Sequence, residues 1–391
     1  MYSSVCLLFI VTLGYVASKA VVEENDQIFS AKLHVFRPWK NCELYKQMNY
    51  THHLCETELS DPFSVVLKNH DDFIYMMSVE IGIDKLEFWV AVDTGSNDFW
   101  VFGESCDSKK NKNCEGHNKF VPEKKKIIDN EFSVVYESNR VTGLTIRDTI
   151  HLTPQIVVHA QIFGAVDYIK QKVPYDGILG LDMRKVGRNK DEFPVFINAF
   201  QQKQIKKPIF GIFVQAEGRV GEITFGGINK LLLKEKTGIS AKIVGKGTMT
   251  IGMQKMDLGG VEVCKEGDAS CHALIDTGCS LIYGPEAVVA KFNKDHLATT
   301  EKGLHYRVIC KDIPNFPDIV ITIDNKPLTL ESKYYTYSDT DSEGVAICYS
   351  GIREGSSVVW QFGDSLLAKY YTEFNLGDEL ITFYQKSNVR P

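Results

Sequence analysis

The sequence predicts an all-β protein with a few short helices, built as two pseudo-symmetric β lobes around a central cleft. Two observations support this prediction. Most apolar stretches are short and rich in β-branched or aromatic residues, and one short phrase occurs twice. The phrase is an apolar run that enters an Asp-Thr-Gly turn, at 91–96 and again at 274–280. Because an internal repeat indicates a repeated structural unit, each lobe is expected to present one carboxylate.

The expected strands are separated by turns rich in Gly, Asn, Asp and Pro. They cover 73–81, 146–156, 211–215, 223–225 and 319–323. Short helices are expected at 194–204, 285–293 and 364–369. A chain of 391 residues is long enough for two hydrophobic cores, and we expect an N-terminal lobe at 61–236 and a C-terminal lobe at 237–391.

Composition and the N-terminus restrict the class of protein. With 44% hydrophobic and 24% charged residues, the chain has an ordinary globular composition, and its net charge of −6 argues against a nucleic-acid partner. Residues 6–17 form an apolar run that is too short to span a bilayer and is closed by small residues. This pattern is typical of a secretory signal peptide, which we assign to residues 1–20. No other stretch predicts a membrane anchor.

Asp93 and Asp276, one in each turn, are the candidate catalytic residues. Two carboxyl groups in contact cannot both ionise, so one keeps a proton over a wide acidic range. The ionised member can deprotonate a water molecule while the protonated member hydrogen-bonds an amide carbonyl. Such a pair works without a metal or another cofactor, and we expect neither.

The residues that follow each aspartate are expected to hold the pair in register. Glycine allows the two turns to approach closely, and each threonine hydroxyl can bond the backbone across the interface. The next residue is Ser in the first copy and Cys in the second. The expected supporting residues are Thr94, Gly95, Ser96, Thr277, Gly278 and Cys279.

Further segments, in order along the chain, resemble the pepsin-like aspartic proteases from about residue 62 to about residue 384. They are Asn97-Asp98-Phe99-Trp100-Val101, Tyr136 followed by Thr142-Gly143, Tyr175-Asp176-Gly177-Ile178-Leu179-Gly180-Leu181, Phe225-Gly226-Gly227-Ile228, Trp360-Gln361-Phe362-Gly363-Asp364 and Tyr370-Tyr371-Thr372. The resemblance implies the bilobal acid-protease fold and a divergent member of the pepsin and cathepsin D type. It also implies an aspartic endopeptidase that cleaves proteins at acidic pH through a water activated by the Asp93/Asp276 pair.

The resemblance also implies how substrate is bound. An extended polypeptide can add to the cleft as a strand, with its side chains in alternating pockets. Tyr136 resembles the tyrosine of the flap hairpin, with Trp100 as its support, and Phe99, Tyr175 and Ile178 are expected to wall apolar pockets. We expect inhibition by pepstatin-type compounds and a monomeric protein.

The cysteines indicate an oxidising compartment, because their spacings suggest local bridges that match the family pattern. The expected pairs are Cys106–Cys114, Cys264–Cys271 and Cys310–Cys348, with Cys42–Cys55 as a possible fourth. Cys6 leaves with the signal peptide, so nine cysteines remain and at least one is unpaired within the chain. We expect that cysteine to be Cys279.

The resemblance also implies a propeptide, expected at residues 21–60, because family members are commonly made with a basic prosegment that neutralises the carboxylates across the cleft; here basic residues precede an acidic group. The alternative is a permanent extension held by the Cys42–Cys55 bridge. Asn49 lies in a glycosylation sequon. Together with the signal peptide, these features predict the secretory pathway, with the protein secreted or endolysosomal.

Four positions depart from the family pattern. Glu137 and Asn139 replace flap glycines, Cys279 stands where a hydroxyl usually bonds the second aspartate, and Gln361 replaces an apolar residue. A thiol is a weaker donor, so the pKa of Asp276 is expected to rise. Because both carboxylates are kept, we favour a working acid protease. The alternative is a catalytically weak or inactive relative that binds peptides.

Overall fold

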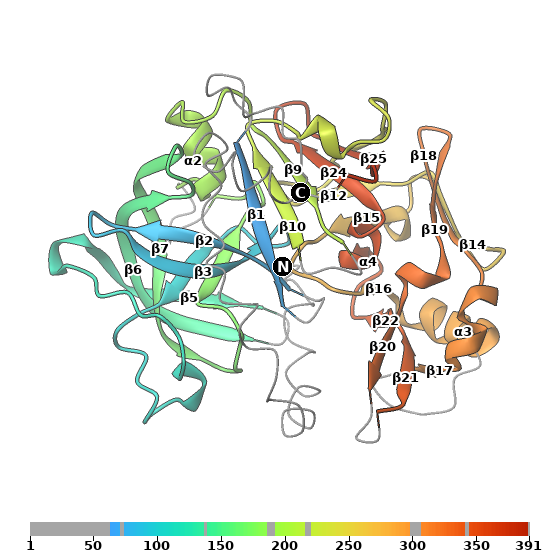
Figure 1. The fold of residues 1–391 in the computed structure, drawn as a ribbon, viewed down its shortest axis with the longest axis horizontal. Coiled ribbons are helices and arrows are strands. Elements are labelled where there is room, and N and C mark those ends of the chain that lie inside the picture. Colours follow the sequence, from blue (N-terminus) through green and yellow to red (C-terminus); the bar gives the residue numbers. More distant parts are fainter. Residues whose placement is uncertain are drawn as a thin grey trace.

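The computed structural model describes residues 63–70, 74–136, 139–185, 192–215, 220–297, 306–340 and 344–389. These residues form a bilobal, mostly β structure, so the predicted fold class is confirmed (Figure 1). The expected signal peptide, propeptide, Cys42–Cys55 pair and Asn49 lie outside the described residues, as does Glu137. Within the described part of the chain, no helix is long and apolar enough to cross a membrane.

The first ten strands precede residue 226. They are β1 (Phe63–His70), β2 (Ile74–Ile81), β3 (Leu86–Asp93), β4 (Phe99–Phe102), β5 (Ile127–Val135), β6 (Arg140–His151), β7 (Val157–Ile169), β8 (Gly177–Gly180), β9 (Ile209–Phe213) and β10 (Val220–Phe225). Helix α2 (Val195–Gln201) lies between β8 and β9. Short 3₁₀ helices cover Lys112–Cys114, Lys124–Lys126 and, after β10, Lys230–Leu232.

The remaining strands are shorter on average and belong to the second half of the chain. They are β11 (Ile239–Lys242), β12 (Thr250–Gly252), β13 (Lys255–Leu258), β14 (Val261–Lys265), β15 (His272–Ile275), β16 (Ile282–Pro285), β17 (Arg307–Val308), β18 (Ile319–Ile323), β19 (Lys326–Leu330), β20 (Thr336–Thr340), β21 (Ala346–Ser350), β22 (Ile352–Gly355), β23 (Trp360–Phe362), β24 (Tyr370–Asn375) and β25 (Leu380–Gln385). The helices here are α3 (Glu286–His296) and α4 (Asp364–Leu367), with 3₁₀ turns at Ala269–Cys271, Cys310–Asn315 and Ser332–Tyr334.

A 13-stranded sheet joins both halves of the chain, in the order β11-β25-β24-β9-β10-β1-β2-β3-β8-β4-β7-β6-β5. Figure 1 shows β5, β6 and β7 at one side of the molecule and β9, β10 and β24 near its middle. Three smaller sheets complete the second lobe, with the orders β12-β15-β23-β16-β22, β14-β13-β18-β19 and β17-β21-β20. The last strands of the chain therefore tie the second half to the first.

The two Asp-Thr-Gly turns follow equivalent strands. β3 ends at Asp93 and pairs in parallel with β8, while β15 leads into Asp276 and pairs in parallel with β23. β4 then pairs antiparallel with β8, and β16 pairs antiparallel with β23. The two registers place Ile178 and Gln361 at matching positions beside the strands that carry the aspartates. The repeated phrase is thus a repeated structural unit.

The prediction of a strand at 146–156 is wrong at its C-terminal end, because β6 ends at His151. The Thr153 hydroxyl accepts hydrogen bonds from the backbone N–H groups of Gln155 (3.1 Å) and Ile156 (3.0 Å). This local bonding turns the chain inside an apolar run, as threonine side chains often do.

Proline marks the start of two helices. Pro194 and Pro285 precede α2 and α3, with φ values of −57° and −55° that suit the entry to a helix. α3 continues to His296, beyond the predicted end, whereas α2 ends earlier than predicted, at Gln201.

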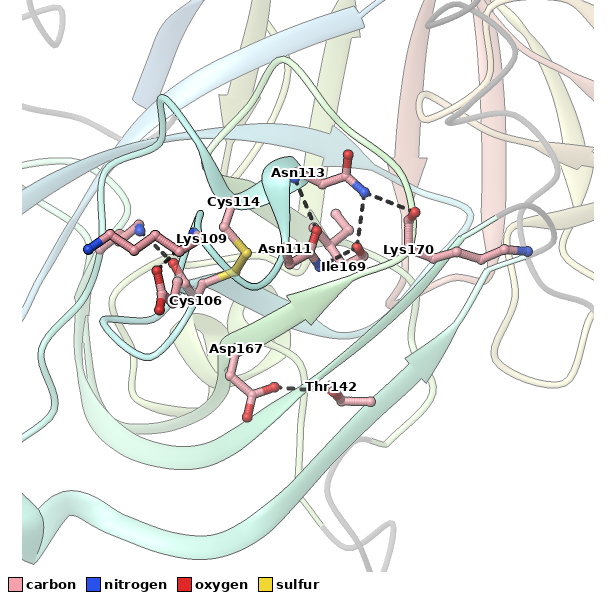
Figure 2. Close-up of a disulfide and its surroundings, with 11 residues drawn as sticks. Cys106, Lys109, Asn111, Asn113, Cys114, Thr142, Asp167, Ile169 and Lys170 are labelled. Carbon is pink, nitrogen blue, oxygen red and sulfur yellow. Dashed lines mark hydrogen bonds between the residues drawn. A yellow bond between two sulfur atoms is a disulfide. The ribbon is translucent and has the colours of Figure 1, made fainter.

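Three disulfides join the pairs that the sequence predicted: Cys106–Cys114, Cys264–Cys271 and Cys310–Cys348. Figure 2 shows the first bridge in the loop between β4 and β5. The side-chain amides of Asn111 and Asn113 donate hydrogen bonds to the Ile169 carbonyl, at 2.7 and 3.3 Å. The bridge and these amides fix the loop to the end of β7.

We predict that Gly177→Ala destabilises the fold. β8 lies between β3 and β4, and a Cβ at Gly177 would lie 2.0 Å from the backbone oxygen of Trp100. The backbone must shift to relieve this contact, so the free energy of unfolding should fall by about 1 to 3 kcal/mol. Urea denaturation measures the change. Gly252→Ala is the matched strand control, because its Cβ meets only a Val244 methyl at 3.3 Å. Equal losses in both variants would contradict the prediction.

Candidate active site

The two Asp-Thr-Gly turns are joined by reciprocal hydrogen bonds from their threonines. The Thr94 hydroxyl donates to the Ile275 carbonyl (2.8 Å) and accepts from the Thr277 backbone N–H (3.0 Å). The Thr277 hydroxyl donates to the Val92 carbonyl (2.8 Å) and accepts from the Thr94 N–H (3.0 Å). Every donor and acceptor in this set is buried, so the bonds fix the relative position of the two turns.

Glycine makes the close approach possible, as the sequence predicted. A Cβ at Gly95 would lie 2.4 Å from Asp276 Oδ2, and a Cβ at Gly278 would lie 2.5 Å from Asp93 Oδ1. Each carboxyl group therefore rests against the glycine of the opposite turn. Both aspartate side chains are fully buried.

Besides the contact between the two carboxyl groups, each of them accepts one backbone hydrogen bond and one hydrogen bond from another side chain. Asp93 accepts from the Gly95 N–H (2.9 Å) and from the Ser96 hydroxyl. Asp276 accepts from the Gly278 N–H at 2.8 Å. Its side-chain donor is the amide nitrogen of Gln361, which lies 2.5 Å from Asp276 Oδ2.

These contacts divide the charge of the pair. Burial raises the pKa of both carboxyl groups. For Asp93, hydrogen bonds from Ser96, Asp276 and Gly95, and the charge of Arg184, oppose this rise. For Asp276, the negative charge of Asp93 adds to burial, so its pKa lies well above the ordinary value. The pair shares one proton at acidic pH, and these effects favour Asp276 as its holder and Asp93 as the charged member.

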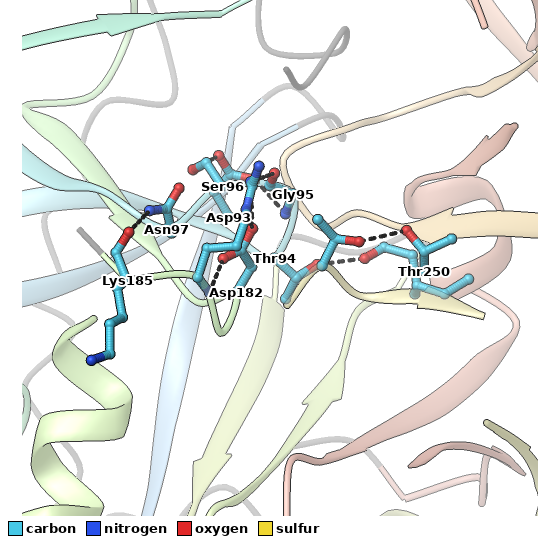
Figure 3. A network of polar contacts seen from close by, with 11 residues as sticks. Asp93, Thr94, Gly95, Ser96, Asn97, Asp182, Lys185 and Thr250 are labelled. Carbon is cyan, nitrogen blue, oxygen red and sulfur yellow. Dashed lines mark hydrogen bonds and ion pairs between the residues drawn. The ribbon is translucent and has the colours of Figure 1, made fainter. Parts of the chain in front are cut away.

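A contact between buried Asp182 and half-exposed Arg184 lies close to Asp93. Figure 3 shows Asp182 close to Asp93 and Ser96, and the Asp182 backbone N–H donates to the Ser96 carbonyl at 2.9 Å. Arg184 Nε donates to Asp182 Oδ2 at 2.7 Å, and the same guanidinium reaches the Gly95 carbonyl at 3.4 Å. Sequence reasoning missed this pair, although the two residues lie one and three positions after the 175–181 segment.

Tyr136 is held by Trp100, as the sequence predicted. The indole N–H of Trp100 donates to the Tyr136 hydroxyl at 2.7 Å. The Tyr136 backbone N–H donates to the Asn139 carbonyl at 2.8 Å, and the Asn139 side chain accepts from the N–H groups of Arg140 and Gln171. Asn139 is therefore anchored to the neighbouring loop as well as to its own hairpin.

The three expected pocket residues are buried in the structure. Tyr175 and Ile178 belong to the core cluster that contains Trp100 and Tyr136, with exposed fractions of 1% each. Phe99, with an exposed fraction of 2%, packs against Phe163 at a ring-centroid distance of 5.4 Å. Ile178 lies opposite Ala91, two residues before Asp93, and a contact of the three residues with substrate stays a prediction.

The prediction that Cys279 is the unpaired cysteine is wrong. Cys279 is fully buried and disulfide-bonded, and it is separate from the three bridges described above. A cysteine count shows whether the number is odd or even, but it does not give the distances that decide which sulfur atoms form a bridge. A disulfide sulfur has no hydrogen to donate, so the expected weak hydrogen bond from a Cys279 thiol to Asp276 is also wrong. Gln361 makes the side-chain bond instead.

Comparison with known proteins agrees with this geometry. A family model described as eukaryotic aspartyl protease matches residues 74–386. The chain is 29% identical to pepsin A of Sus scrofa over 323 residues, covering 79% of this chain and 80% of that protein.

Two further relatives match at the same level. Cathepsin D of Gallus gallus is 28% identical over 345 residues, covering 83% of this chain and 84% of that protein. Pregnancy-associated glycoprotein 1 of Bos taurus is 27% identical over 326 residues, covering 81% and 82% respectively.

We predict that Thr94→Val weakens the junction between the turns. The variant keeps the shape but removes one donor and one acceptor, leaving the Ile275 carbonyl and the Thr277 N–H without their buried partner. The free energy of unfolding should fall by about 2 to 3 kcal/mol. Thr94→Ser keeps the hydroxyl and should lose less. Urea denaturation of the two variants checks this, and equal losses would argue against the hydrogen bonds as the cause.

We predict that Asp182 makes stability fall as pH rises. Burial raises its pKa to about 7, against the lowering effect of Arg184. The folded state therefore holds a proton that the unfolded state releases, and this stabilisation is lost between about pH 4 and pH 7. Melting temperatures across this range should fall less steeply for Asp182→Asn. The exposed control Asp84→Asn should keep the wild-type slope. An unchanged slope in Asp182→Asn would contradict the assignment.

Proposed function

The chain belongs to the eukaryotic aspartyl protease family, and we propose that it is an aspartic endopeptidase active at acidic pH. The observation that carries the proposal is the complete carboxyl pair. Asp93 and Asp276 are buried and in contact, and each accepts a backbone and a side-chain hydrogen bond. Such a pair is a general base and a general acid at once.

In the proposed mechanism, ionised Asp93 takes a proton from a water molecule held between the carboxyls. The water oxygen attacks the peptide carbonyl carbon while Asp276 gives its proton to the carbonyl oxygen. This forms a neutral tetrahedral intermediate with two hydroxyl groups on the former carbonyl carbon. Asp93 then protonates the amide nitrogen, Asp276 recovers a proton from one hydroxyl, and the C–N bond breaks. The products are a carboxylic acid and an amine, and the pair returns to one proton.

The proposed substrates are polypeptides bound in an extended conformation. Backbone hydrogen bonds would hold the chain as an added strand. Tyr136, fixed by its hydrogen bond to Trp100, is placed on the hairpin that would cover the bound segment. Phe99, Tyr175 and Ile178 stay the proposed pocket residues, although their side chains are buried in the structure, and a preference for hydrophobic residues beside the cleaved bond is proposed with them. The proposed location is the secretory pathway, either outside the cell or in endolysosomes.

A peptide-binding protein without activity is the second candidate. The observation that favours it is the altered second turn, in which a disulfide-bonded Cys279 stands at the position that matches Ser96. Gln361 supports the enzyme instead, because Asp276 keeps a side-chain donor. Activity measurements separate the two.

We predict cleavage of an unfolded protein substrate between about pH 3 and pH 6, the range in which the pair holds one proton. Pepstatin should abolish cleavage. Asp93→Asn removes the base and should lower kcat by about 10²-fold or more. Because the carboxyl pair is buried, circular dichroism and thermal melting must first show that the variant is folded.

The matched control is Asp84→Asn, which removes the same charge from an exposed turn and should leave kcat unchanged. Cleavage that resists pepstatin and persists in Asp93→Asn would overturn the proposed mechanism. A folded, processed protein that binds pepstatin but cleaves nothing would favour the peptide-binding candidate.

A further inference from the structure

We propose that Gln361 is a positioning residue of the carboxyl pair, supplying to Asp276 the side-chain hydrogen bond that Ser96 supplies to Asp93. This inference rests on the proposed function and concerns the same site. The contacts are direct: the Gln361 amide nitrogen lies 2.5 Å from Asp276 Oδ2, and the Ser96 hydroxyl donates to Asp93 Oδ2.

The strand register gives Gln361 its position. Gln361 is opposite Leu274 in the parallel pair of β23 with β15, two residues before Asp276. The matching residue in the first lobe is Ile178, which is opposite Ala91, two residues before Asp93. The same place beside the aspartate strand thus carries an amide in one lobe and an alkyl group in the other.

The residue three positions after each aspartate shows the reverse difference. In the first lobe this residue is Ser96, whose hydroxyl bonds the carboxylate. In the second it is Cys279, whose sulfur is held in a disulfide and has no proton to donate. The first lobe therefore combines a hydroxyl with an alkyl group, and the second combines a disulfide sulfur with an amide. Each lobe directs one neutral side-chain donor at its carboxylate.

The amide is held firmly enough to serve this role. β23 lies between β15 and β16, with Gln361 opposite Tyr283 of β16. The Asp276 backbone N–H donates to the Phe362 carbonyl at 3.0 Å, which ties the aspartate turn to the same strand. Gln361 has an exposed fraction of only 6%. A buried donor on a buried carboxylate has little competition from water.

Other charged groups around the pair come from different elements. Asp182 and Arg184 follow β8, Asp98 precedes β4, and Tyr136 and Tyr175 face Asp93 from the flap side and the start of β8. Asp364 follows β23, and Asp93 itself faces Asp276. Gln361 adds no charge to this set. It stabilises the anion of Asp276 relative to the acid, so its loss should make that proton harder to remove.

The test uses Gln361→Met, which keeps the length of the side chain but removes the donor. Activity should then fall off at a higher pH, since the alkaline limb reports deprotonation of Asp276. A hydrogen bond to a charged group corresponds to a shift of about one pH unit or more. We also expect kcat to fall about tenfold with little change in KM.

Gln161→Met is the matched control. Gln161 is a buried amide with an exposed fraction of 1%, and its side chain bonds the Ile162 and Phe193 carbonyls away from the pair. This variant should lose stability without moving the pH profile. A second variant adds Cys279→Ser to Gln361→Met, which gives the second lobe the hydroxyl of the first. The alkaline limb should return toward the wild-type position.

The outcomes separate this inference from the proposed function. If the wild-type enzyme is active and Gln361→Met keeps its pH profile, or Gln161→Met shifts it equally, the role of Gln361 is overturned. If the double variant folds but its alkaline limb does not return toward the wild-type position, Gln361 is not equivalent to Ser96. If the double variant does not fold, the pH profile of Gln361→Met alone decides. If the wild type cleaves nothing, the pH dependence of pepstatin binding reports the same proton without turnover. An unchanged dependence in Gln361→Met would then reject the inference.

Discussion

The structure depends on bringing two carboxyl groups together in a buried interface. Four hydrogen bonds between the Thr94 and Thr277 turns hold this contact. Each bond contributes only about 1 kcal/mol net, whereas an unpaired charge in the interior is far more costly. The chain therefore needs a second means of tolerating the contact, which is to keep one proton on the pair. Geometry and protonation are thus linked. The contact between the two carboxyl groups makes one of them an acid and the other a base, and the same contact needs the threonine hydrogen bonds to hold it.

Near symmetry of the backbone does not give symmetry of charge. The backbone donors from Gly95 and Gly278 are nearly equal, at 2.9 and 2.8 Å. The difference comes from the surroundings. Burial raises the pKa of both carboxyl groups; at Asp93 the hydrogen bonds from Ser96, Asp276 and Gly95 oppose this rise, with a smaller contribution from the charge of Arg184, whereas at Asp276 the charge of Asp93 adds to it. Asp182 holds that guanidinium through a bond of 2.7 Å. Arg184, which follows β8, thus adds to the contacts that favour the charge on Asp93.

Most of the site could be predicted from the sequence because its parts are local or repeated. The duplicated phrase predicted the glycine contact and the threonine bonds, and the cysteine spacings together with the family pattern predicted all three disulfides. The partner of Gln361 could not be predicted, since Asp276 is separated from it by 85 residues and only the register of two parallel strands brings them together. The pairing of Cys279 failed for a similar reason, because a count of cysteines contains no distances.

This failure has a general physical cause. Considered one position at a time, Cys279 removes a donor from Asp276 and Gln361 places a polar amide in a buried strand, so each appears to weaken the site. In the fold the two changes meet at one carboxylate, and the amide nitrogen occupies the donor role that the hydroxyl has beside Asp93. The buried amide is satisfied by the carboxylate, and the carboxylate by the amide. Asp276 therefore has a side-chain hydrogen-bond donor, as Asp93 does. Whether it has one depends on the strand register that places Gln361 as much as on the identity of the residue after the turn.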